Sequence, residues 1–470
     1  MPLTLHNTLS GRQEEFVPLV PGKVGMYVCG VTVYDRSHVG HARALVTFDV
    51  LFRYLQHCGY EVTFIRNFTD VDDKIIKRAN EAGISTADLV ESNIRAFAED
   101  MAVLGCRAPT LEPRATQHIP EMIELIEELI ERRLAYPAGG DVYFAVDKFP
   151  GYGKLSKRKL DDMQAGARIE VDERKQHPMD FALWKASKPD EPWWESPWGR
   201  GRPGWHIECS VMSSKYLGQP FDIHGGGTDL IFPHHENEIA QSEAAKGCAF
   251  ARYWVHNGMV TIDKEKMSKS LGNFMTVQQA AARVGGEALR LFTIGTHYRS
   301  PLDFSEQRLD DAAGNIVRIY EALARAEDVL QGESAPADAA VMAEFNAAMD
   351  DDLNTARALA VVFDTVRALN RALDGGDAAA AGPLYAALRA LGAVLGIAQA
   401  APHEFLARQR RQHLEATEVN PAEIERLIAA RNAARKARDF KRADEIRAEL
   451  KAKGIVLEDG PSATSWRVER

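Results

Sequence analysis

The sequence predicts an α/β protein: a Rossmann-like parallel sheet, split by an insertion, then an α-helical bundle and a small C-terminal domain. Residues 25–34 form an apolar run rich in Val and Tyr, which is typical of a strand buried on both faces. Apolar side chains at helical spacing follow at residues 41–58, and Gly59 ends that helix. Residues 62–65 indicate a second strand, so this region predicts the βαβ unit of nucleotide-binding sheets.

The α/β alternation breaks off in the middle of the chain and resumes later. A helix is expected at residues 116–134, and a stretch rich in Pro and Trp runs from residue 189 to residue 203. A strand at 220–224, a helix at 234–246 and a strand at 253–262 then restore the pattern. We therefore expect one sheet that is assembled from two separated parts of the chain.

The C-terminal part has a different character. Beyond about residue 310 the chain is rich in Ala with strong helical periodicity, which predicts a helical bundle. A break at residues 399–402 separates this bundle from a last segment. From Arg426 to Lys453 ten Lys or Arg stand against four Asp or Glu, so the local charge is 10 − 4 = +6.

Length and composition exclude several classes of protein. The 470 residues are 45% hydrophobic and 26% charged, as in globular rather than disordered or fibrous proteins. No uncharged apolar run is long enough to cross a bilayer, and residues 1–16 lack a secretion signal, so we expect a cytoplasmic protein. The net charge of 57 − 67 = −10 argues against a general affinity for nucleic acid or membranes. Any polyanionic partner must meet a local basic patch.

The first motif that could carry chemistry is His38-Val39-Gly40-His41, between the first predicted strand and helix. Unpaired N–H groups at a helix N-terminus favour an anion, Gly40 allows close approach, and two imidazoles can donate to phosphate oxygens. A polar loop with two surface histidines is the commoner meaning of such a tetrapeptide. Its position between strand and helix favours a nucleotide site.

The second motif is Lys266-Met267-Ser268-Lys269-Ser270, which follows a predicted strand. Two lysines three residues apart can stabilise the charge that builds up on a departing pyrophosphate. A solvated lysine turn is an equally good explanation of the composition alone. The joint presence of both motifs, each next to a strand, favours the functional interpretation.

The third group of residues suggests a metal site. His234 and Glu238 are four apart on a predicted helix, so both side chains can face one point. An imidazole and a carboxylate would be half of a zinc site, with cysteine thiolates as the remaining ligands, although surface His/Glu pairs are more common. Five cysteines without a signal peptide make a disulfide framework improbable. Cys29 and Cys209 are candidate ligands, and Cys58, Cys106 and Cys248 are expected to be small core residues.

The first two motifs resemble the HIGH and KMSKS signatures of class I aminoacyl-tRNA synthetases, with Val39 in place of the usual isoleucine. The resemblance implies ATP binding on a split Rossmann sheet, with His38, Gly40 and His41 near the phosphates. It also implies that Lys266 and Lys269 stabilise the transition state of adenylation, with Lys269 contacting ATP and Mg²⁺ accompanying the nucleotide.

The resemblance is closest to the cysteinyl-tRNA synthetases and extends over essentially the whole chain. It is carried by the segments MYVCGVTVYDRSHVGHAR, NFTDVDDKIIKRA, GRPGWHIECS, FDIHGGGTDLIFPHHENEIAQ, DKEKMSKSLGNF and GIVLEDGPSATSWR. It implies the substrates ATP, L-cysteine and tRNA(Cys), a monomer, and no DNA or membrane partner. It also implies one Zn²⁺ bound by Cys29, Cys209, His234 and Glu238.

Other pocket residues follow from the same resemblance. Thr69, Trp205 and His224 are expected to line the cysteine pocket, and Gly226 and Asp229 to meet the adenosine of ATP. Zinc suits this task because pocket shape alone discriminates by only about 1–3 kcal/mol per methylene-sized difference. A thiolate binds zinc far better than a hydroxyl does, so serine is rejected at binding and no editing domain is needed.

The predicted domains combine these observations. They are the first half of the catalytic domain (1–115), a connective insertion (116–203), the second half (204–265), the KMSKS and stem-contact region (266–315), a tRNA-binding helical bundle (316–400) and a small anticodon-recognition domain (401–470).

Three alternative functions follow from the same resemblance. A cysteine ligase of mycothiol synthesis, which uses an amino-sugar acceptor, resembles the catalytic half but lacks the anticodon-recognising end. A tRNA-binding paralogue without catalysis would show eroded motifs, which this chain does not. Pyridoxal-phosphate-dependent persulfide formation has been associated with lysines that resemble Lys74, Lys77, Lys266 and Lys269, and the sequence does not test it.

Overall fold

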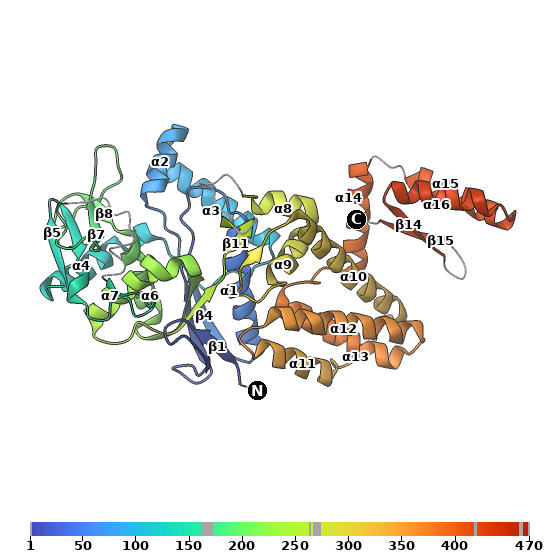
Figure 1. Cartoon of the computed structure of the whole chain (residues 1–470), viewed down its shortest axis with the longest axis horizontal. Helices are drawn as coiled ribbons and strands as arrows, with labels where there is room; N and C mark the ends of the chain where they lie inside the picture. The colour runs from blue at the N-terminus through green and yellow to red at the C-terminus, as the bar shows by residue number, and fades with distance from the viewer. Residues whose placement is uncertain are drawn as a thin grey trace. The chain divides into compact units, whose positions relative to one another are not determined.

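The computed structural model describes residues 2–160, 173–262, 265–266, 274–417, 421–459 and 464–468 (Figure 1). The chain divides into two compact units. The first contains Met1–Ser305, Met342–Val361 and Val394–Gly396, and the second contains Glu306–Val341, Val362–Ala393 and Ile397–Arg470. The first unit holds almost all of the predicted site residues.

A four-stranded parallel sheet lies at the centre of the first unit, in the order β10-β9-β3-β4. Its strands are β3 (Lys23–Val28), β4 (Glu61–Arg66), β9 (Phe221–Gly227) and β10 (Ala251–Asn257). Met26 pairs with Ile223, so the N-terminal pair of strands joins the later pair directly. This confirms the predicted Rossmann-like sheet that is split by an insertion.

Strand β3 is shorter than the apolar run that predicted it. It ends at Val28, and the chain turns at Gly30, whose N–H donates to Asn67 Oδ1 at 2.8 Å. Thr32 then bridges Thr69, beyond the end of β4. The expectation of a strand through Tyr34 is therefore wrong, because the side-chain bond at Gly30 interrupts the pairing and only an isolated bridge at Thr32 follows.

Helix α1 (Val39–His57) connects β3 to β4 and completes the predicted βαβ unit. His38 is its N-cap, so the helix begins inside the HVGH motif rather than after it. Most of its side chains are buried, including Phe48, Leu51 and Leu55, because the helix packs inside the unit.

The middle of the chain forms a helical layer and a second sheet. After α2 (Asp73–Ala82), α3 (Thr86–Val103), a short turn (Ala115–His118) and α4 (Ile119–Glu131), an antiparallel sheet has the order β5-β6-β7-β8. Its strands are β5 (Ala135–Ala138), β6 (Asp141–Phe144), β7 (Phe181–Ala186) and β8 (Gly201–Pro203). A common core joins this sheet to α4, α6 (Trp205–Leu217) and α7 (Glu236–Lys246), with Ile126, Trp184, Met212 and Ile239 at its centre.

The predicted strand at 253–262 is two strands, β10 and β11 (Val260–Ile262). The chain leaves the sheet at Gly258, whose N–H donates to the Tyr298 carbonyl at 2.8 Å. Strand β11 pairs instead with β12 (Glu265–Lys266) and with β13 (Leu302–Asp303). Helices α8 (Val277–Val284) and α9 (Gly286–Ile294) follow, and a hairpin of β1 (Thr4–Asn7) and β2 (Arg12–Glu15) lies near the N-terminus.

The C-terminal region is helical, as predicted. Its long helices are α10 (Glu306–Leu330), α11 (Ala339–Met349), α12 (Thr355–Asp374), α13 (Ala378–Leu395) and α14 (Pro402–Thr417). One described helix, α13, is long and apolar enough to cross a membrane by length and composition alone. Its Arg389, however, donates to the Ala398 carbonyl at 2.7 Å, and its Leu388 and Leu391 are buried, as in a bundle helix.

A small α+β module ends the chain. It consists of α15 (Pro421–Lys436), α16 (Phe440–Ala452) and the antiparallel strands β14 (Ile455–Asp459) and β15 (Thr464–Val468). Ile424, Leu427, Ile446, Leu450 and Trp466 form its core. The basic segment is thus a helical hairpin, which turns at Arg438 with a positive φ of 61°.

Candidate metal centre and active site

The four predicted metal ligands converge at the carboxyl end of the central sheet. Cys29 directly follows β3, Cys209 lies on α6, and His234 and Glu238 flank the start of α7. Cys29 Sγ lies 3.5 Å from Cys209 Sγ and 3.4 Å from Glu238 Oε1. His234 Nε2 lies 3.0 Å from Glu238 Oε1, and the four ligand atoms are all within 4.8 Å of one another.

These residues fit a zinc ion in number, chemistry and spacing. Zinc bonds of about 2.0–2.3 Å in a tetrahedron place ligand atoms about 3.3–3.8 Å apart, close to the separations observed. Burial, together with the neighbouring Cys209 sulfur, raises the pKa of the Cys29 thiol well above its usual value. Burial also raises the pKa of Cys209. Both thiols are therefore protonated without a metal, and a bound cation would take the place of their protons.

His224 and Trp205 lie against this cluster, as predicted. His224 is fully buried, and its Nε2 is 2.8 Å from Glu238 Oε2. Its ring stacks on Trp254 with centroids 4.4 Å apart. Trp205 begins α6 and stacks on His234 at 4.1 Å, and 37% of it is exposed, so one face of the cluster can reach solvent.

Thr69 belongs to a neighbouring polar group rather than to the ligand cluster itself. Its Oγ1 donates to Glu208 Oε2 at 2.7 Å, and both residues are buried. Burial raises the pKa of Glu208 well above its usual value. Asn67 lies against the ligand cluster, because its Oδ1 is 3.7 Å from Cys209 Sγ. Neither Glu208 nor Asn67 was predicted from the sequence, although Glu208 directly precedes the candidate ligand Cys209.

The HVGH motif forms the N-terminus of α1, where it was expected. The rings of His38 and His41 stack with centroids 3.9 Å apart, and the His38 N–H donates to His41 Nδ1 at 3.1 Å. A Cβ on Gly40 would lie 2.7 Å from the His38 ring. Glycine is required there because the imidazole occupies the space of any larger side chain.

Residues that follow the second motif are joined to the first motif by backbone hydrogen bonds. The Val39 N–H donates to the Met275 carbonyl at 3.0 Å, and the Val277 N–H donates to the Ser37 carbonyl at 3.0 Å. Lys269 lies outside the described residues, and so does the side chain of Lys266, whose backbone belongs to β12. The structure therefore places the two ends of the KMSKS segment, but not its lysines.

Gly226 and Asp229, the expected adenosine contacts, lie at and just after the end of β9. A Cβ on Gly226 would lie 2.9 Å from His235 Cε1, so Gly226 makes room for that imidazole. Asp229 lies in a short helical turn, Thr228–Leu230. Both positions are at the carboxyl edge of the sheet, where nucleotides bind in such folds.

Comparison with known proteins decides the family. Residues 15–314 match the family described as the class I (C) catalytic domain of tRNA synthetases, and residues 344–399 match the DALR domain. Residues 417–467 match the anticodon binding domain of cysteinyl-tRNA ligase. A "Cysteine--tRNA ligase" of Geobacter sulfurreducens is 57% identical over 481 residues, which cover 100% of both chains. The chain belongs to the cysteine–tRNA ligase family. A second member, from Geobacter metallireducens, is also 57% identical, over 485 residues and 100% of both chains.

Solved structures extend the likeness of this cysteine–tRNA ligase family member to the wider class I fold. Methionyl-tRNA synthetase of Mycobacterium tuberculosis, in complex with methionyl-adenylate, superposes with a TM-score of 0.58 at 17% identity. That match covers 79% of this chain and 90% of the other. A ternary LeuRS–tRNA–LeuAMS complex from Agrobacterium radiobacter gives 0.61 at 11% identity, over 82% and 87%. At these identities the likeness concerns the fold alone.

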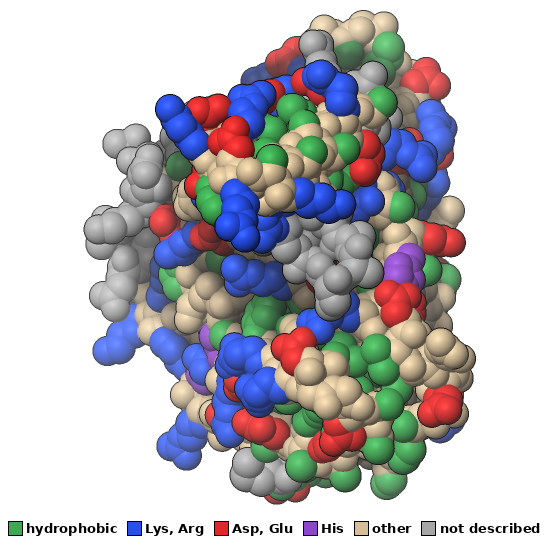
Figure 2. Space-filling model, turned by 90° about the vertical axis from the view of Figure 1, so that its right-hand side faces the viewer, with side chains coloured by type: hydrophobic (Ala, Val, Ile, Leu, Met, Phe, Trp, Pro, Cys, Tyr) green, Lys and Arg blue, Asp and Glu red, His purple; other side chains and the backbone are tan. Residues whose placement is uncertain are grey.

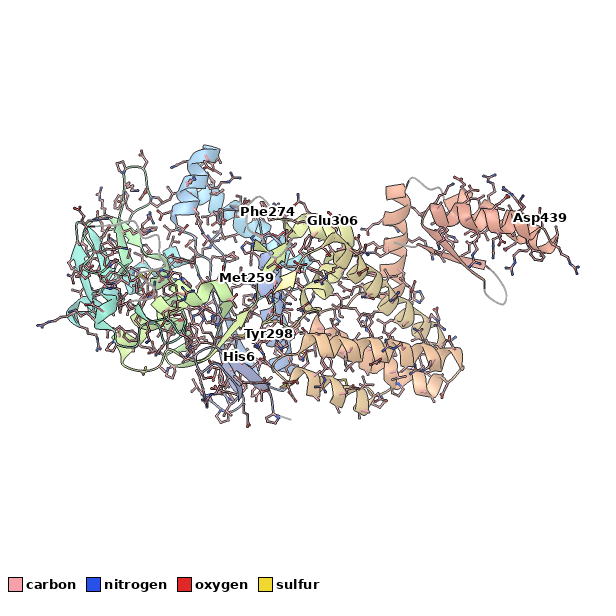
Figure 3. All side chains as sticks on the ribbon, in the orientation of Figure 1. His6, Met259, Phe274, Tyr298, Glu306 and Asp439 are labelled. Atoms are coloured by element: carbon pink, nitrogen blue, oxygen red, sulfur yellow. The ribbon has the colours of Figure 1, made fainter. Side chains whose placement is uncertain are left out.

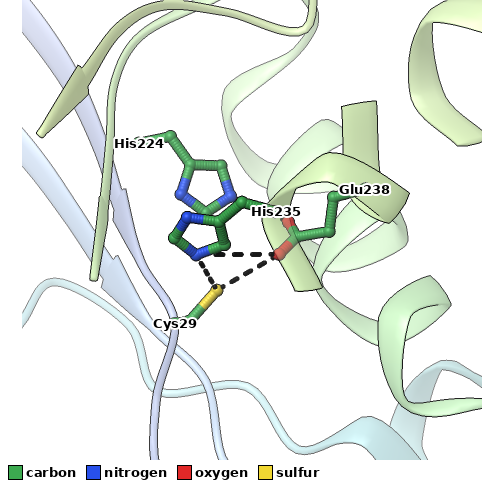
Figure 4. Close-up of side chains that lie close together, drawn as sticks. All are labelled: Cys29, His224, His235 and Glu238. Atoms are coloured by element: carbon green, nitrogen blue, oxygen red, sulfur yellow. Dashed lines mark hydrogen bonds and ion pairs between the residues drawn. The ribbon is translucent and has the colours of Figure 1, made fainter. Parts of the chain in front are cut away.

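Cysteine–tRNA ligase family membership does not decide between two overlapping ligand sets. Figure 4 shows Cys29, His224, His235 and Glu238, which also lie close enough to hold a metal. His235 Nε2 is 3.3 Å from Cys29 Sγ and 3.9 Å from Glu238 Oε1. His235 was not predicted from the sequence, although the spacing of three between His235 and Glu238 places both on the same side of the helix.

His235 is held in turn by a neighbour on β10. Its Nδ1 lies 2.8 Å from His256 Nε2, and His256 Nδ1 lies 2.8 Å from Thr8 Oγ1. Burial and the nearby His224 lower the pKa of His256 to about 3, so this imidazole is neutral. These contacts from Thr8 through His256 fix the orientation of His235, which contacts Cys29.

Proposed function

We propose that this chain activates L-cysteine with ATP, releasing pyrophosphate, and then transfers the cysteinyl group to the 3′-terminal adenosine of tRNA(Cys). The convergence of two thiols, an imidazole and a carboxylate beside the HVGH helix carries the proposal, in a chain whose relatives match over their full length. The reaction requires a site for a thiol substrate and a site for a triphosphate, and these two features are neighbours at one edge of one sheet.

Cys29, Cys209, His234 and Glu238 would hold Zn²⁺ in this proposal. When bound, zinc supplies a ligand position for the thiolate of the substrate, which a hydroxyl oxygen cannot match. His206 supports His234 from behind, because the two Nδ1 atoms lie 2.9 Å apart. Burial lowers the pKa of His206 to about 3, so this neighbour stays neutral and leaves His234 Nε2 facing Glu238.

Around this centre, chain residues orient the amino acid. The half-exposed Trp205 indole lies over His234 and would close the pocket on its solvent side. Buried His224 and Thr69 would define its inner wall, with Thr69 near the polar end of cysteine. The pocket is then small, and its shape disfavours substrates larger than cysteine.

The nucleotide would lie along the N-terminus of α1. In the first step the carboxylate of cysteine attacks the α-phosphate of ATP, and pyrophosphate leaves. His38 and His41 would hold the phosphates, Mg²⁺ would accompany ATP, and Gly40, Gly226 and Asp229 would contact the nucleotide. Lys266 and Lys269 would stabilise the charge that develops on the leaving group.

The test is cysteine-dependent ATP–pyrophosphate exchange together with charging of tRNA(Cys). We expect exchange with cysteine and not with serine, and acylation of tRNA by the whole chain. Exchange without any tRNA charging, but with ligation of cysteine to an amino sugar, would favour the ligase alternative. The match of residues 417–467 to an anticodon binding domain supports tRNA as the acceptor. Resemblance also favours a cytoplasmic location and a monomer. Sedimentation would check the oligomeric state.

A further inference from the structure

Arg43, one turn into α1, is a fully buried arginine with an unusual set of partners. It is 1% exposed. Its guanidinium donates to the carbonyls of Thr293, Thr296 (3.1 Å), His297 (2.7 Å) and Ser300 (3.5 Å). Within the described part of the chain all its acceptors are backbone carbonyls, and none is a carboxylate. Burial without a counter-charge lowers the pKa of Arg43 to about 10.

The carbonyls that Arg43 holds lie in the last turn of α9 and in the loop between α9 and β13. This loop continues into Leu302 and Asp303, which pair with Val260 and Thr261 of β11. Strand β11 leads directly into the segment that carries Lys266 and Lys269. The guanidinium therefore fixes the strand at the N-terminal end of the KMSKS segment relative to helix α1.

The residues that follow the KMSKS motif are fixed to the same helix. Backbone hydrogen bonds join residues 37–39 to residues 275–277. Buried Asp100 reinforces them, because it accepts from the Ser37 N–H at 3.3 Å and from Gln278 Nε2 at 2.8 Å. The described residues on either side of the KMSKS motif, 260–262 and 275–278, are thus held by groups in the first turns of α1 and by Asp100.

The loop held by Arg43 is also braced from its other side. Asp352 accepts from Tyr298 Oη at 2.7 Å and from Arg299 Nε at 2.6 Å (Figure 3 labels Tyr298 and the nearby Met259). Asp352 and Leu353 both adopt positive φ, 55° and 52°, which is costly for residues other than glycine. The Asp352 carboxylate thus holds the loop through Tyr298 and Arg299, while Arg43 holds its carbonyls.

We propose that Arg43 is a positioning residue for the adenylation step: it sets the position of strand β11, which precedes the KMSKS motif, relative to the HVGH helix. It is too deeply buried to contact a substrate. Its planar fork of donors spans carbonyls from residue 293 to residue 300, a geometry that the single ammonium of lysine cannot reproduce. The inference rests on the proposed function, because it assigns Arg43 to the step in which Lys269 would act.

The test compares Arg43→Lys in two backgrounds, the unaltered chain and Lys269→Ala. The measurement is kcat for cysteine-dependent ATP–pyrophosphate exchange, with KM for ATP and for cysteine recorded separately. Since a displacement of about 1 Å can cost about 100-fold, we expect Arg43→Lys to lower kcat about 10- to 100-fold in the unaltered chain. In Lys269→Ala the same change should cost less than about threefold, because residues that act together are not additive.

Arg53→Lys is the matched control. Arg53 is also a buried arginine of α1, but its Nε donates to Asp49 at 2.7 Å and its Nη2 donates to the Gly105 carbonyl, away from the α9–β13 loop. It should lose comparable thermal stability and less than about threefold in kcat. Tyr298→Phe releases the same loop from the Asp352 side, and it serves if Arg43→Lys does not fold. Its loss of kcat should also be suppressed in Lys269→Ala.

Several outcomes would overturn the proposal. They are an unchanged kcat in Arg43→Lys, an equal loss in Arg53→Lys, or losses that simply multiply with that of Lys269→Ala. A pure stability role predicts the last two. If the unaltered chain shows no cysteine-dependent exchange at all, the proposed function fails and this inference fails with it, which separates that result from the others.

Discussion

Cys29 and Glu238 are the residues on which the candidate metal centre depends, because both belong to each possible ligand set. The sets differ in their other sulfur and nitrogen atoms: one uses Cys209 and His234, the other His224 and His235. Substitutions at Cys209 and His235 therefore distinguish them, since each of these residues belongs to only one set.

We expect Cys209→Ser to lower bound zinc from about one ion per chain to less than about a tenth of an ion, because a buried hydroxyl is a poor zinc ligand. His235→Asn should weaken zinc binding by only about 10- to 100-fold, as for an outer-shell contact. Metal analysis after dialysis and a chelator competition measure both effects. Cys248→Ser is the control, because Cys248, like Cys58, is exposed and is not the core residue expected from the sequence. Complete loss of zinc in His235→Asn with retention in Cys209→Ser would favour the other set.

Burial of His256 makes a prediction about acid stability. The pKa of His256 is lowered to about 3 in the folded chain, below the value near 6.5 expected when it is unfolded. The unfolded chain therefore takes up a proton between these values and the folded chain does not. Below about pH 6.5 this one group should lower the free energy of unfolding by about 1.4 kcal/mol per pH unit.

The measurement is the urea unfolding midpoint of the first unit as a function of pH between about 6 and 4.5. His256→Asn should give a shallower dependence on pH than the unaltered chain, whatever its stability at neutral pH. His57→Asn, at an exposed position on α1, is the control. An identical slope in His256→Asn would show that this imidazole is not the group that titrates on unfolding.

At the scale of elements, the start of α1 is shaped by a glycine that a helix would otherwise disfavour. Gly40→Ala would place a methyl group 2.7 Å from the His38 ring. The imidazole must then leave its position over His41. We expect KM for ATP in pyrophosphate exchange to rise about 10-fold, with the KM for cysteine changed much less.

Gly314→Ala on α10 is the control for this substitution. Gly314 is also helical, but a Cβ there would meet no atom within 4 Å. Alanine should stabilise that helix by about 0.5–1 kcal/mol and leave both KM values unchanged. An unaltered KM for ATP in Gly40→Ala would argue against phosphate binding at the HVGH turn.

The elements also show what the sequence could and could not predict. The βαβ unit, the split sheet and the helical C-terminal region followed from local periodicity, and the ligand residues followed from motifs and resemblance. The ends of β3 and of β10 did not, because they depend on distant partners at Asn67 and Tyr298. Strand order likewise cannot be read locally.

Strand order explains the residues that were missed. His256 lies opposite Gly226 only because β10 pairs in parallel with β9. That pairing brings His256 to His235, and His235 to Cys29. Sequence spacing places His235 on the same side as Glu238, but only the folded sheet shows what it contacts.

At the scale of the whole molecule, the chain is acidic overall but has a local excess of Lys and Arg in residues 426–453. Figure 2 views the molecule from the side of the C-terminal helices, where blue Lys and Arg alternate with red acidic side chains. Lys436, Arg438 and Lys441 are exposed at the turn between α15 and α16, beside Phe440, which is 62% exposed. Basic groups around an exposed aromatic ring suit the phosphates and unpaired bases of an RNA loop.

We therefore expect the double variant Lys436→Gln, Lys441→Gln to weaken tRNA(Cys) binding without changing cysteine-dependent pyrophosphate exchange. Each lost phosphate contact should lower the slope of log affinity against log salt by roughly 0.7–0.9. Filter binding at several salt concentrations, beside exchange assays, measures both quantities. Lys23→Gln, at an exposed lysine of β3 in the first unit, is the control. An unchanged salt slope in the double variant would place the RNA elsewhere.

The split of the central sheet has a consequence for synthesis of the chain. Cys29 and Glu238, whose side chains meet in the candidate metal centre, are 209 residues apart. At about 5–20 residues per second, Cys29 leaves the ribosome roughly 10–40 s before Glu238 does. Throughout that interval its thiol has neither its metal partners nor the β9 strand beside it, so the nascent chain depends on a reducing environment until its second half arrives.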